Sequence, residues 1–373
     1  MENALSRAGF VSHEPKRVDA ALIERELAQL WRPTEGHEDE APTTRAATAN
    51  VIVFCRTEQQ HEAVAQEMLT IVARHPSRVV TLVADPSSQS PELEVSVTTH
   101  CRLVDGRQQI CSEDVTIRTG PPGLRRVPSM VRSLLLGDLP TTLWWASPEA
   151  PPLVGALLDE LAGLANQVIY DSVAWSDPLR QLVVTAKWLA GERSQVVSDL
   201  AWRRPKLWRR LMAQSLDPAC APEALESITE VQVEHGPHAL TQAWLLVGWL
   251  ALRLGWQPRG GKVAPGPEVR WWFEWPHGQP QVLIRRRDDG AAEIKSLQIR
   301  SRVSGRPVTF RFHAQGPGRV SVLVDGLASR ELTLSGPVAS RGELVARQLL
   351  DLAPDQLFRQ SVGLARTMAE AIL

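Results

Sequence analysis

A strand, a capped helix and a second strand follow one another early in the chain, and this order constrains the fold more than any other feature. Residues 49–55 (ANVIVFC) form an almost unbroken apolar run, typical of a strand buried on both faces. Thr57 and Gln60 make a capping box before a helical apolar stripe, and RVVTLVAD (78–85) is the next strand. This order predicts a βαβ unit with parallel strands.

Strand and helix patterns continue to residue 172. Two alternating runs, 93–104 and 108–118, predict a hairpin about Asp105-Gly106. The further elements expected are a helix at 128–136, a strand at 141–145, a helix at 152–164 and a strand at 167–172. We therefore predict an α/β domain with a mixed sheet over residues 46–172.

The second half, residues 173–373, predicts an α+β domain. Beyond Pro267 short alternating runs are separated by Gly-containing turns, which indicates an antiparallel meander. The other elements expected are helix 177–190, a Trp-bearing segment at 199–215, strand 227–235, buried helix 238–254 and two closing helices, the first capped by Ser340. The fold class is mixed α/β, or α+β overall.

Residues 1–45 predict an N-terminal arm outside both domains. An amphipathic helix is expected at 17–31, with Asp19 as its N-cap. Four acidic residues between 35 and 40, together with Pro and Gly, favour an unpacked linker.

Composition and terminal patterns predict a cytoplasmic protein that binds neither membrane nor nucleic acid. The first residues contain no apolar core of a signal peptide, and the run Ala243 to Leu252 has about half of the roughly 20 residues that cross a bilayer. Four cysteines are too few for a secreted disulfide scaffold. Lys and Arg (41) nearly balance Asp and Glu (42), which argues against a nucleic-acid partner.

Motifs for cofactors and catalysis are missing where they would be expected. The first βα turn reads Cys55-Arg56-Thr57-Glu58, without the glycines that let a backbone approach pyrophosphate. GWQPRGGKV (255–263) departs from a phosphate loop in spacing and has Val263 at the hydroxyl position, so a plain turn is expected. No Gly-x-Ser-x-Gly elbow occurs. We expect no cofactor, no metal site and no enzyme activity.

Two weaker hypotheses, a metal site and a ligand site, remain open beside the expectation of a non-enzyme. His235 and His238 have a metal-like gap, although Gly-Pro between them favours a loop before a helix. Asp171 and Ser172 end an apolar strand, where α/β sheets bind ligands, although a simple turn is favoured. The alternative function is therefore an enzyme using Asp171 and one of these histidines on a sugar phosphate or lactone, or a sensor using arginines for the phosphate.

Cys101 and Cys111 are a candidate redox pair. If the hairpin turn has three residues, Asp105 to Arg107, the two cysteines lie directly opposite each other, within disulfide reach. A two-residue turn would place them on opposite faces, and buried free thiols are the competing interpretation.

The stretch from Asp199 to Arg210 (DLAWRRPKLWRR) is the most unusual in a chain with 13 Trp, 6 Phe and 1 Tyr. Its arginines alternate with Trp202 and Trp208, which allows cation–π stacking, and both residue types are enriched at binding hot spots. An amphipathic helix with buried tryptophans and solvated arginines is an equal alternative. The segment is thus a candidate for partner binding or for the core.

Several linked motifs resemble the glucose-6-phosphate dehydrogenase assembly protein family, also called OpcA. They are TRAATANVIVFC, HPSRVVTLVAD, GDLPTTLWW, NQVIYDS, SDLAWRRPKLWR and LLVGWLALRLGW, in this order from about Thr44 onward. The resemblance implies a non-catalytic protein that binds glucose-6-phosphate dehydrogenase and promotes its active oligomer in the oxidative pentose phosphate pathway. It implies no catalytic residue, and no cysteine follows Cys220 to match regulatory thiols of relatives. The candidate partner-binding residues are Trp144, Trp145, Asp199, Trp202, Arg203, Arg204, Trp208 and Arg209.

Overall fold

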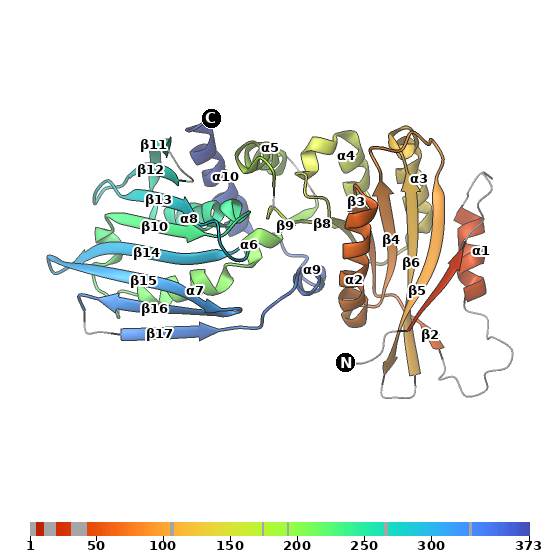
Figure 1. Cartoon of the computed structure of the whole chain (residues 1–373), viewed down its shortest axis with the longest axis horizontal. Helices are drawn as coiled ribbons and strands as arrows, with labels where there is room; N and C mark the ends of the chain where they lie inside the picture. The colour runs from red at the N-terminus through yellow and green to blue at the C-terminus, as the bar shows by residue number, and fades with distance from the viewer. Residues whose placement is uncertain are drawn as a thin grey trace.

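The computed structural model describes residues 5–10, 20–30, 43–104, 108–173, 175–191, 194–264, 268–327 and 330–373 of the chain. They form two sheets side by side, with helices on and between them (Figure 1). The mixed α/β fold class is confirmed. Asp19, the acidic run at 35–40 and the hairpin turn at 105–107 lie outside the described residues.

The first sheet has nine strands and is mostly parallel. In sheet order they are β1 (Leu5–Phe10), β5 (Glu94–Val104), β6 (Gln108–Thr119), β4 (Ser77–Ala84), β3 (Ala49–Cys55), β7 (Thr141–Trp145), β8 (Gln167–Tyr170) and β9 (Val196–Asp199), with β2 (Thr43–Arg45) beside β6. Strands β6 to β9 along this order pair in parallel, whereas β1, β5 and β6 pair antiparallel. The predicted βαβ unit is confirmed as β3, α2 (Glu58–Arg74) and β4.

Helices cover both faces of this sheet. Their bounds are α1 (Ala20–Leu30), α3 (Val127–Leu134), α4 (Ala156–Ala162) and α5 (Pro178–Ala190), with 3-10 turns at Pro121–Arg126 and Pro151–Val154. Residues of α1, α3, α4 and α5 share one apolar cluster, while α2 shares the other with α9 (Arg341–Leu349). Both faces being covered explains why β3 is buried from Asn50 onward and β4 is buried along its whole length.

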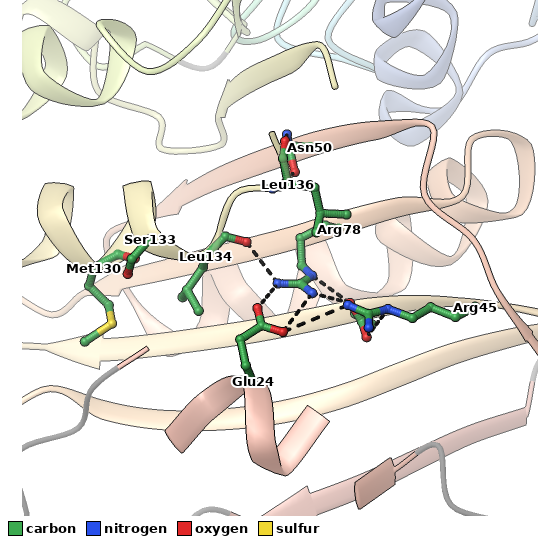
Figure 2. A network of polar contacts seen from close by, with 9 residues as sticks. Glu24, Arg45, Asn50, Arg78, Met130, Ser133, Leu134 and Leu136 are labelled. Carbon is green, nitrogen blue, oxygen red and sulfur yellow. Dashed lines mark hydrogen bonds and ion pairs between the residues drawn. The ribbon is translucent and has the colours of Figure 1, made fainter. Parts of the chain in front are cut away.

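Helix α1 of the arm packs against the first sheet, where it buries Ile23 and Leu27. Figure 2 shows how Arg78, a fully buried residue of β4, reaches it. The Arg78 guanidinium donates to Glu24 of α1 at 2.7 Å, to Glu113 of β6 at 2.7 Å and to the Leu134 carbonyl at 2.9 Å. The described parts of the arm are therefore packed: α1 in the core, and β1 and β2 in the sheet.

The second sheet has eight strands. In sheet order they are β11 (Gln257–Ala264), β12 (Glu268–Glu274), β13 (Gln281–Arg286), β10 (Glu230–His235), β14 (Ile294–Val303), β15 (Arg306–Gly316), β16 (Arg319–Asp325) and β17 (Arg330–Ser335). Strand β10 lies in the middle, parallel to β13 and antiparallel to β14. The predicted antiparallel meander is thus confirmed for β14 to β17 and wrong for the sheet as a whole, because an earlier strand is inserted.

Three of the described helices pack with this sheet: α7 (Lys206–Ser215), α8 (Leu240–Leu254) and α10 (Gln356–Glu370). The short helix α6 (Leu200–Arg203) packs instead on β9, α8 and α9, and a 3-10 turn, Leu225–Ser227, precedes β10. Helix α8 is buried along most of its length, as its composition predicts. The plain turn expected at 255–263 is wrong, because most of it forms the edge strand β11. A Cβ at Gly261 would lie 2.7 Å from the Trp271 ring, so glycine here permits close packing of that edge.

The closing helices tie the two sheets together. Helix α9 packs on α2 of the first sheet, and α10 packs on both α5 and α8 (Figure 1). Strand β9 also follows residue 172, yet it completes the first sheet beside β8. The division of the chain into two domains at residue 172 stays a prediction. Strand β9 and helix α9 both follow residue 172 in sequence and yet pack with the first sheet.

Candidate functional site

The Trp- and Arg-rich segment begins where the first sheet ends. Asp199 is the last residue of β9 and the N-cap of α6, and its carboxylate accepts the Ala201 N–H at 2.8 Å. Pro205 then separates α6 from α7, since proline lacks the N–H that would continue the helix. The predicted site thus lies on two helices separated by a proline, α6 of four residues and α7 of ten.

Asp199 is buried and holds the ends of β8 and β9 together. It is 2% exposed, and it accepts from the Ser172 N–H at 3.0 Å and the Ser172 hydroxyl at 2.5 Å. Burial, and then the negative charge of Asp171, raises the pKa of Asp199 to about 7. Its hydrogen bonds to Ser172 and Ala201 oppose this rise only in part.

Asp171 and Arg204 form a bidentate ion pair beside this carboxylate. Both terminal guanidinium nitrogens of Arg204 donate to Asp171, each at 2.7 Å. Burial acts to lower the pKa of Arg204, but the charge and hydrogen bonds of Asp171 outweigh it, so the pKa is raised. Asp171 also accepts the Val173 N–H at 3.2 Å, the turn that the sequence favours here.

Trp202 is packed and hydrogen-bonded within the chain. Its ring is 5% exposed, and the indole N–H donates to Asp355 at 2.9 Å. The Arg209 guanidinium lies 3.8 Å from the ring centroid and donates to the Trp202 carbonyl at 2.8 Å. Burial lowers the pKa of Arg209 to about 10, so it remains charged at neutral pH. The cation–π stack anticipated from the sequence is present, but it is internal.

The rest of the segment also contacts the chain itself. Trp208 is buried in the apolar cluster, and Arg203 pairs with Asp351 at 2.5 Å. Asp351 and Asp355 lie in the exposed linker between α9 and α10, some 150 residues away in sequence. Sequence reasoning missed both acids, because nothing local links them to the arginines. On the segment's surface, Lys206 and Arg210 are exposed.

Trp144 and Trp145 point to opposite faces of the central strand β7, and both are buried. The Trp145 ring stacks on Phe54 at 3.9 Å, and its N–H donates to the Glu149 carbonyl at 3.1 Å. Arg341 of α9 lies 5.5 Å from the Trp144 ring centroid.

The burial of these side chains corrects the idea that the tryptophans meet a partner directly. Trp144, Trp145, Trp202 and Trp208 are core residues of this chain. For Trp202 and Trp208 this agrees with the amphipathic alternative for the segment. Their indole rings already have apolar neighbours, so a partner would have to open the fold to reach them. Only the arginines and the adjoining exposed residues remain accessible.

The first βα turn uses its backbone amides locally. The Thr57 hydroxyl accepts the Gln60 N–H at 3.2 Å, which confirms Thr57 as the N-cap. The reciprocal half of the predicted capping box is wrong, because the Gln60 side chain accepts the Arg56 N–H at 2.8 Å and not that of Thr57. A dinucleotide pyrophosphate would need such amides free at a glycine-rich turn. Here side chains of the chain itself occupy them.

The residues of the alternative enzyme reading are not brought together. His235 ends β10 in the second sheet, is buried, and has its Nδ1 2.8 Å from the Gly236 carbonyl. Burial lowers the His235 pKa. His238 is exposed at the start of α8, with a φ of 63°, whereas Asp171 ends β8 in the first sheet. Within the described part of the chain, no hydrogen bond or ion pair joins Asp171, His235 and His238 to one another.

Cys101 and Cys111 are bonded as a disulfide across β5 and β6. They are register partners, as a three-residue turn predicts, and the free-thiol alternative is wrong in this structure. Cys101 also pairs in register with Leu5 of β1, and Cys111 with Arg45 of β2. The bond therefore lies where both strands of the arm join the sheet.

The described part of the chain contains neither a cluster of metal ligands nor a helix that could span a membrane. There, no three His, Cys, Asp or Glu side chains gather as metal ligands would. None of the described helices combines the length and the apolar character needed to cross a membrane.

Comparison with known proteins gives two family matches. The glucose-6-phosphate dehydrogenase subunit N-terminal domain matches residues 68–187, and the corresponding C-terminal domain matches residues 195–362. Two cyanobacterial relatives bear the name OxPP cycle protein OpcA. The Synechocystis sp. relative is 30% identical over 203 residues, covering 53% of this chain and 41% of the relative. The Synechococcus elongatus relative is 29% identical over 231 residues, covering 61% and 49%.

Among solved structures, an oxidoreductase from Sinorhizobium meliloti aligns with a TM-score of 0.49 and 11% identity, over 88% of this chain and 97% of that one. A score of this size does not establish a shared fold. The matches to the curated relatives span less than half of their length. The two domain models, in contrast, together cover most of this chain, in the order that the sequence motifs predict. The chain belongs to the glucose-6-phosphate dehydrogenase assembly protein (OpcA) family.

Proposed function

We propose that this protein is a non-catalytic partner of glucose-6-phosphate dehydrogenase that binds the enzyme and favours its active oligomer in the oxidative pentose phosphate pathway. The family of its two domains carries the proposal, since both bear the description of a subunit of that dehydrogenase. The names of the cyanobacterial relatives point to the same pathway.

The closed βα turn supports a non-catalytic role. The α2 N-terminus is capped by Thr57 and Gln60, and Glu58 of its first turn pairs with Arg118 at 2.8 Å. A carboxylate at this position repels a pyrophosphate rather than holding it. The NADP chemistry would then take place on the dehydrogenase, and this protein would act through binding alone.

Activation by binding requires different affinities for two states of the dehydrogenase. A partner that bound its active and inactive oligomers equally would shift nothing, however tight the binding. The proposal therefore predicts a larger effect when the dehydrogenase is dilute, because dilution favours its smaller forms.

The test is a dehydrogenase assay with and without this protein, at several substrate and enzyme concentrations, paired with size-exclusion chromatography of the mixture. We expect a shift of the dehydrogenase to a larger complex and a lower apparent KM or higher kcat. Turnover by this protein alone would contradict the non-catalytic role. No complex and no kinetic change, with the dehydrogenase of the same organism, would end the proposal.

The accessible side of the Trp- and Arg-rich segment is our proposed contact. Charge reversal of Lys206 and Arg210 leaves the buried tryptophans in place, so it should weaken the complex without unfolding the chain. Reversal of Arg306 and Arg319, exposed residues of the second sheet, is the matched control. An equal loss in both variants would assign the effect to net charge and not to this segment.

A further inference from the structure

One face of the second sheet carries no helix among the described elements. The side chains of the other face are buried against α7, α8 and α10. On the uncovered face Trp272 of β12 is 38% exposed and Leu323 of β16 is 39% exposed. Antiparallel sheets often expose one polar face to water. Exposed tryptophan and leucine side chains on such a face are not stabilised by water and would be stabilised by burial against a partner.

One row of side chains crosses this face on all eight strands. Cross-strand register places its members directly opposite one another, which puts them on the same face. From β11 to β17 they are Lys262, Arg270, Leu283, Gln232, Gln298, Arg311, Leu323 and Glu331. A cation stands at one end and an anion at the other, with Gln232 and Gln298 on the midline.

The midline of the sheet runs between β10 and β14, with four strands on each side. Glu230 of β10 and Arg300 of β14 face each other across it and form an ion pair at 3.2 Å. Glu234 and Ser296 form a second cross-midline pair at 3.0 Å. The two halves of the face are thus complementary to each other.

We propose that this face is the interface of a twofold-symmetric dimer of the chain, with the axis parallel to the strands along the midline. Such an axis exchanges the two halves of the face. It sets Lys262 of one copy opposite Glu331 of the other, Glu230 opposite Arg300, and Leu283 opposite the aliphatic stem of Arg311. The central glutamines meet each other as hydrogen-bonding amides.

Charge and area both suit a second copy. In the proposed dimer, no residue of this row faces a residue of like charge in the other copy. The two identical faces can therefore approach without charge repulsion along the row. Eight strands about 4.8 Å apart make a face about 34 Å wide, and three rows of side chains make it about 20 Å high. The product, about 700 Å², is close to the roughly 800 Å² per partner of a stable interface. Stacked sheets with nearly aligned strands are a common packing.

The first test measures the oligomeric state of the full chain by sedimentation velocity across the micromolar range. We expect a dimer for the wild type and a monomer for Leu283→Glu, with the dissociation constant raised at least about 100-fold. Leu350→Glu is the control, since Leu350 is 74% exposed in the linker after α9, away from this face. Circular dichroism checks that each variant is folded.

The second test uses a pair of residues that cannot meet within one chain. Lys262 and Glu331 stand on opposite edges of the sheet, about 34 Å apart and well beyond the screening length of about 8 Å. Each single reversal, Lys262→Glu or Glu331→Lys, should weaken the dimer about tenfold. The double reversal should restore it, and mixing the two single variants should give a heterodimer.

The outcomes separate this dimer from the proposed binding of the dehydrogenase. A monomeric wild type, or a dimer unaffected by Leu283→Glu and without coupling between Lys262 and Glu331, overturns the inference. A monomer in which Leu283→Glu abolishes the response of the dehydrogenase also overturns it and assigns the face to that enzyme instead. A dimer with the predicted coupling supports it, whether or not the dehydrogenase responds.

Discussion

The surroundings of Asp199 shift the pKa of its carboxyl group in two opposite directions. As N-cap of α6 and acceptor for Ser172 it makes three hydrogen bonds that favour the charged form. Its burial and the neighbouring Asp171 disfavour that form and prevail, placing the pKa at about 7 against an ordinary value of 3.8. Folding therefore increases the proton affinity of this group.

The first prediction concerns the pH dependence that follows. A carboxyl group whose pKa is raised by folding contributes stability that is complete below its ordinary pKa and is lost as pH rises through about 7. Asp199→Asn removes this titration and keeps an N-capping side chain. We expect the stability of the variant relative to the wild type to increase as pH rises, by on the order of 2 kcal/mol of unfolding free energy.

Thermal melts between about pH 5 and about pH 8 measure this difference. Asp177→Asn, at the half-exposed N-cap of α5, is the matched control and should change the melting temperature equally at each pH. Parallel pH profiles for Asp199→Asn and the wild type would show that the buried carboxyl does not titrate in this range.

The second prediction tests the bidentate pair. Arg204→Met removes both hydrogen bonds to Asp171 and leaves a largely buried carboxylate without its cation. Because both groups keep some exposure, we expect a loss of about 2 kcal/mol, below the cost for a fully buried pair. Urea denaturation measures it. Arg210→Met, at an exposed position, should lose little stability. Equal losses in the two variants would mean that the ion pair of Arg204 with Asp171 contributes no more to stability than an exposed arginine does.

At the residue level, composition identified the unusual segment but not its orientation. Alternating Trp and Arg fit a binding surface and a buried helix equally well, since both place the aromatic rings on one stripe. The deciding contacts come from Asp351 and Asp355, which lie far away in sequence. Sequence reasoning therefore identified Trp202 and Arg203 but not the two acids that hold them.

At the level of elements, local signals located most helices and strands. The Thr57 cap predicted the start of α2, and the apolar run predicted the bounds of β3. The pairing of Cys101 with Cys111 agrees with one of the two turn lengths that the sequence left open. Strand β9 was missed because only four residues pair, and β11 was read as a turn because of its glycines. The insertion of β10 between β13 and β14 depends on long-range pairing, which no local pattern encodes.

The third prediction concerns the hairpin disulfide. Thiol labelling of the denatured protein should modify only Cys55 and Cys220 when it is isolated without reductant, and all four cysteines after treatment with a dithiol. The Cys101→Ser/Cys111→Ser variant should lose about 2 kcal/mol, as expected for closing a short loop. Unchanged labelling under both conditions would end the idea of a redox pair.

The same variant tests whether the bond supports the arm. Because Cys101 and Cys111 pair with β1 and β2, loss of the bond should speed hydrogen exchange in β1 and β2 more than in β7. Helix α1 has its own anchor in the ion pairs of Arg78, so its amides should change less. Uniform acceleration across the sheet would instead indicate a global loss of stability.

At the level of the whole molecule, the chain returns to the first sheet after building the second. Leu344, Val345 and Leu349 of α9 complete the apolar cluster on β3, while α10 packs between α5 and α8. The first sheet therefore depends on residues at the far end of the sequence. Two sheets linked in this way should unfold as one cooperative unit, even though sequence patterns divide the chain near residue 172.

The fourth prediction tests this coupling with Val345→Ala. Val345 is fully buried against the first sheet, so the change opens a cavity there and should cost about 2 kcal/mol. If the sheets unfold together, the slowest-exchanging amides of β3 and of β14 should lose the same protection, although β14 has no contact with the cavity. Val263→Ala, at an exposed position of β11, is the control and should change neither. Faster exchange in β3 alone would mean that the sheets unfold independently, and that α9 stabilises the first sheet without transmitting its loss to the second.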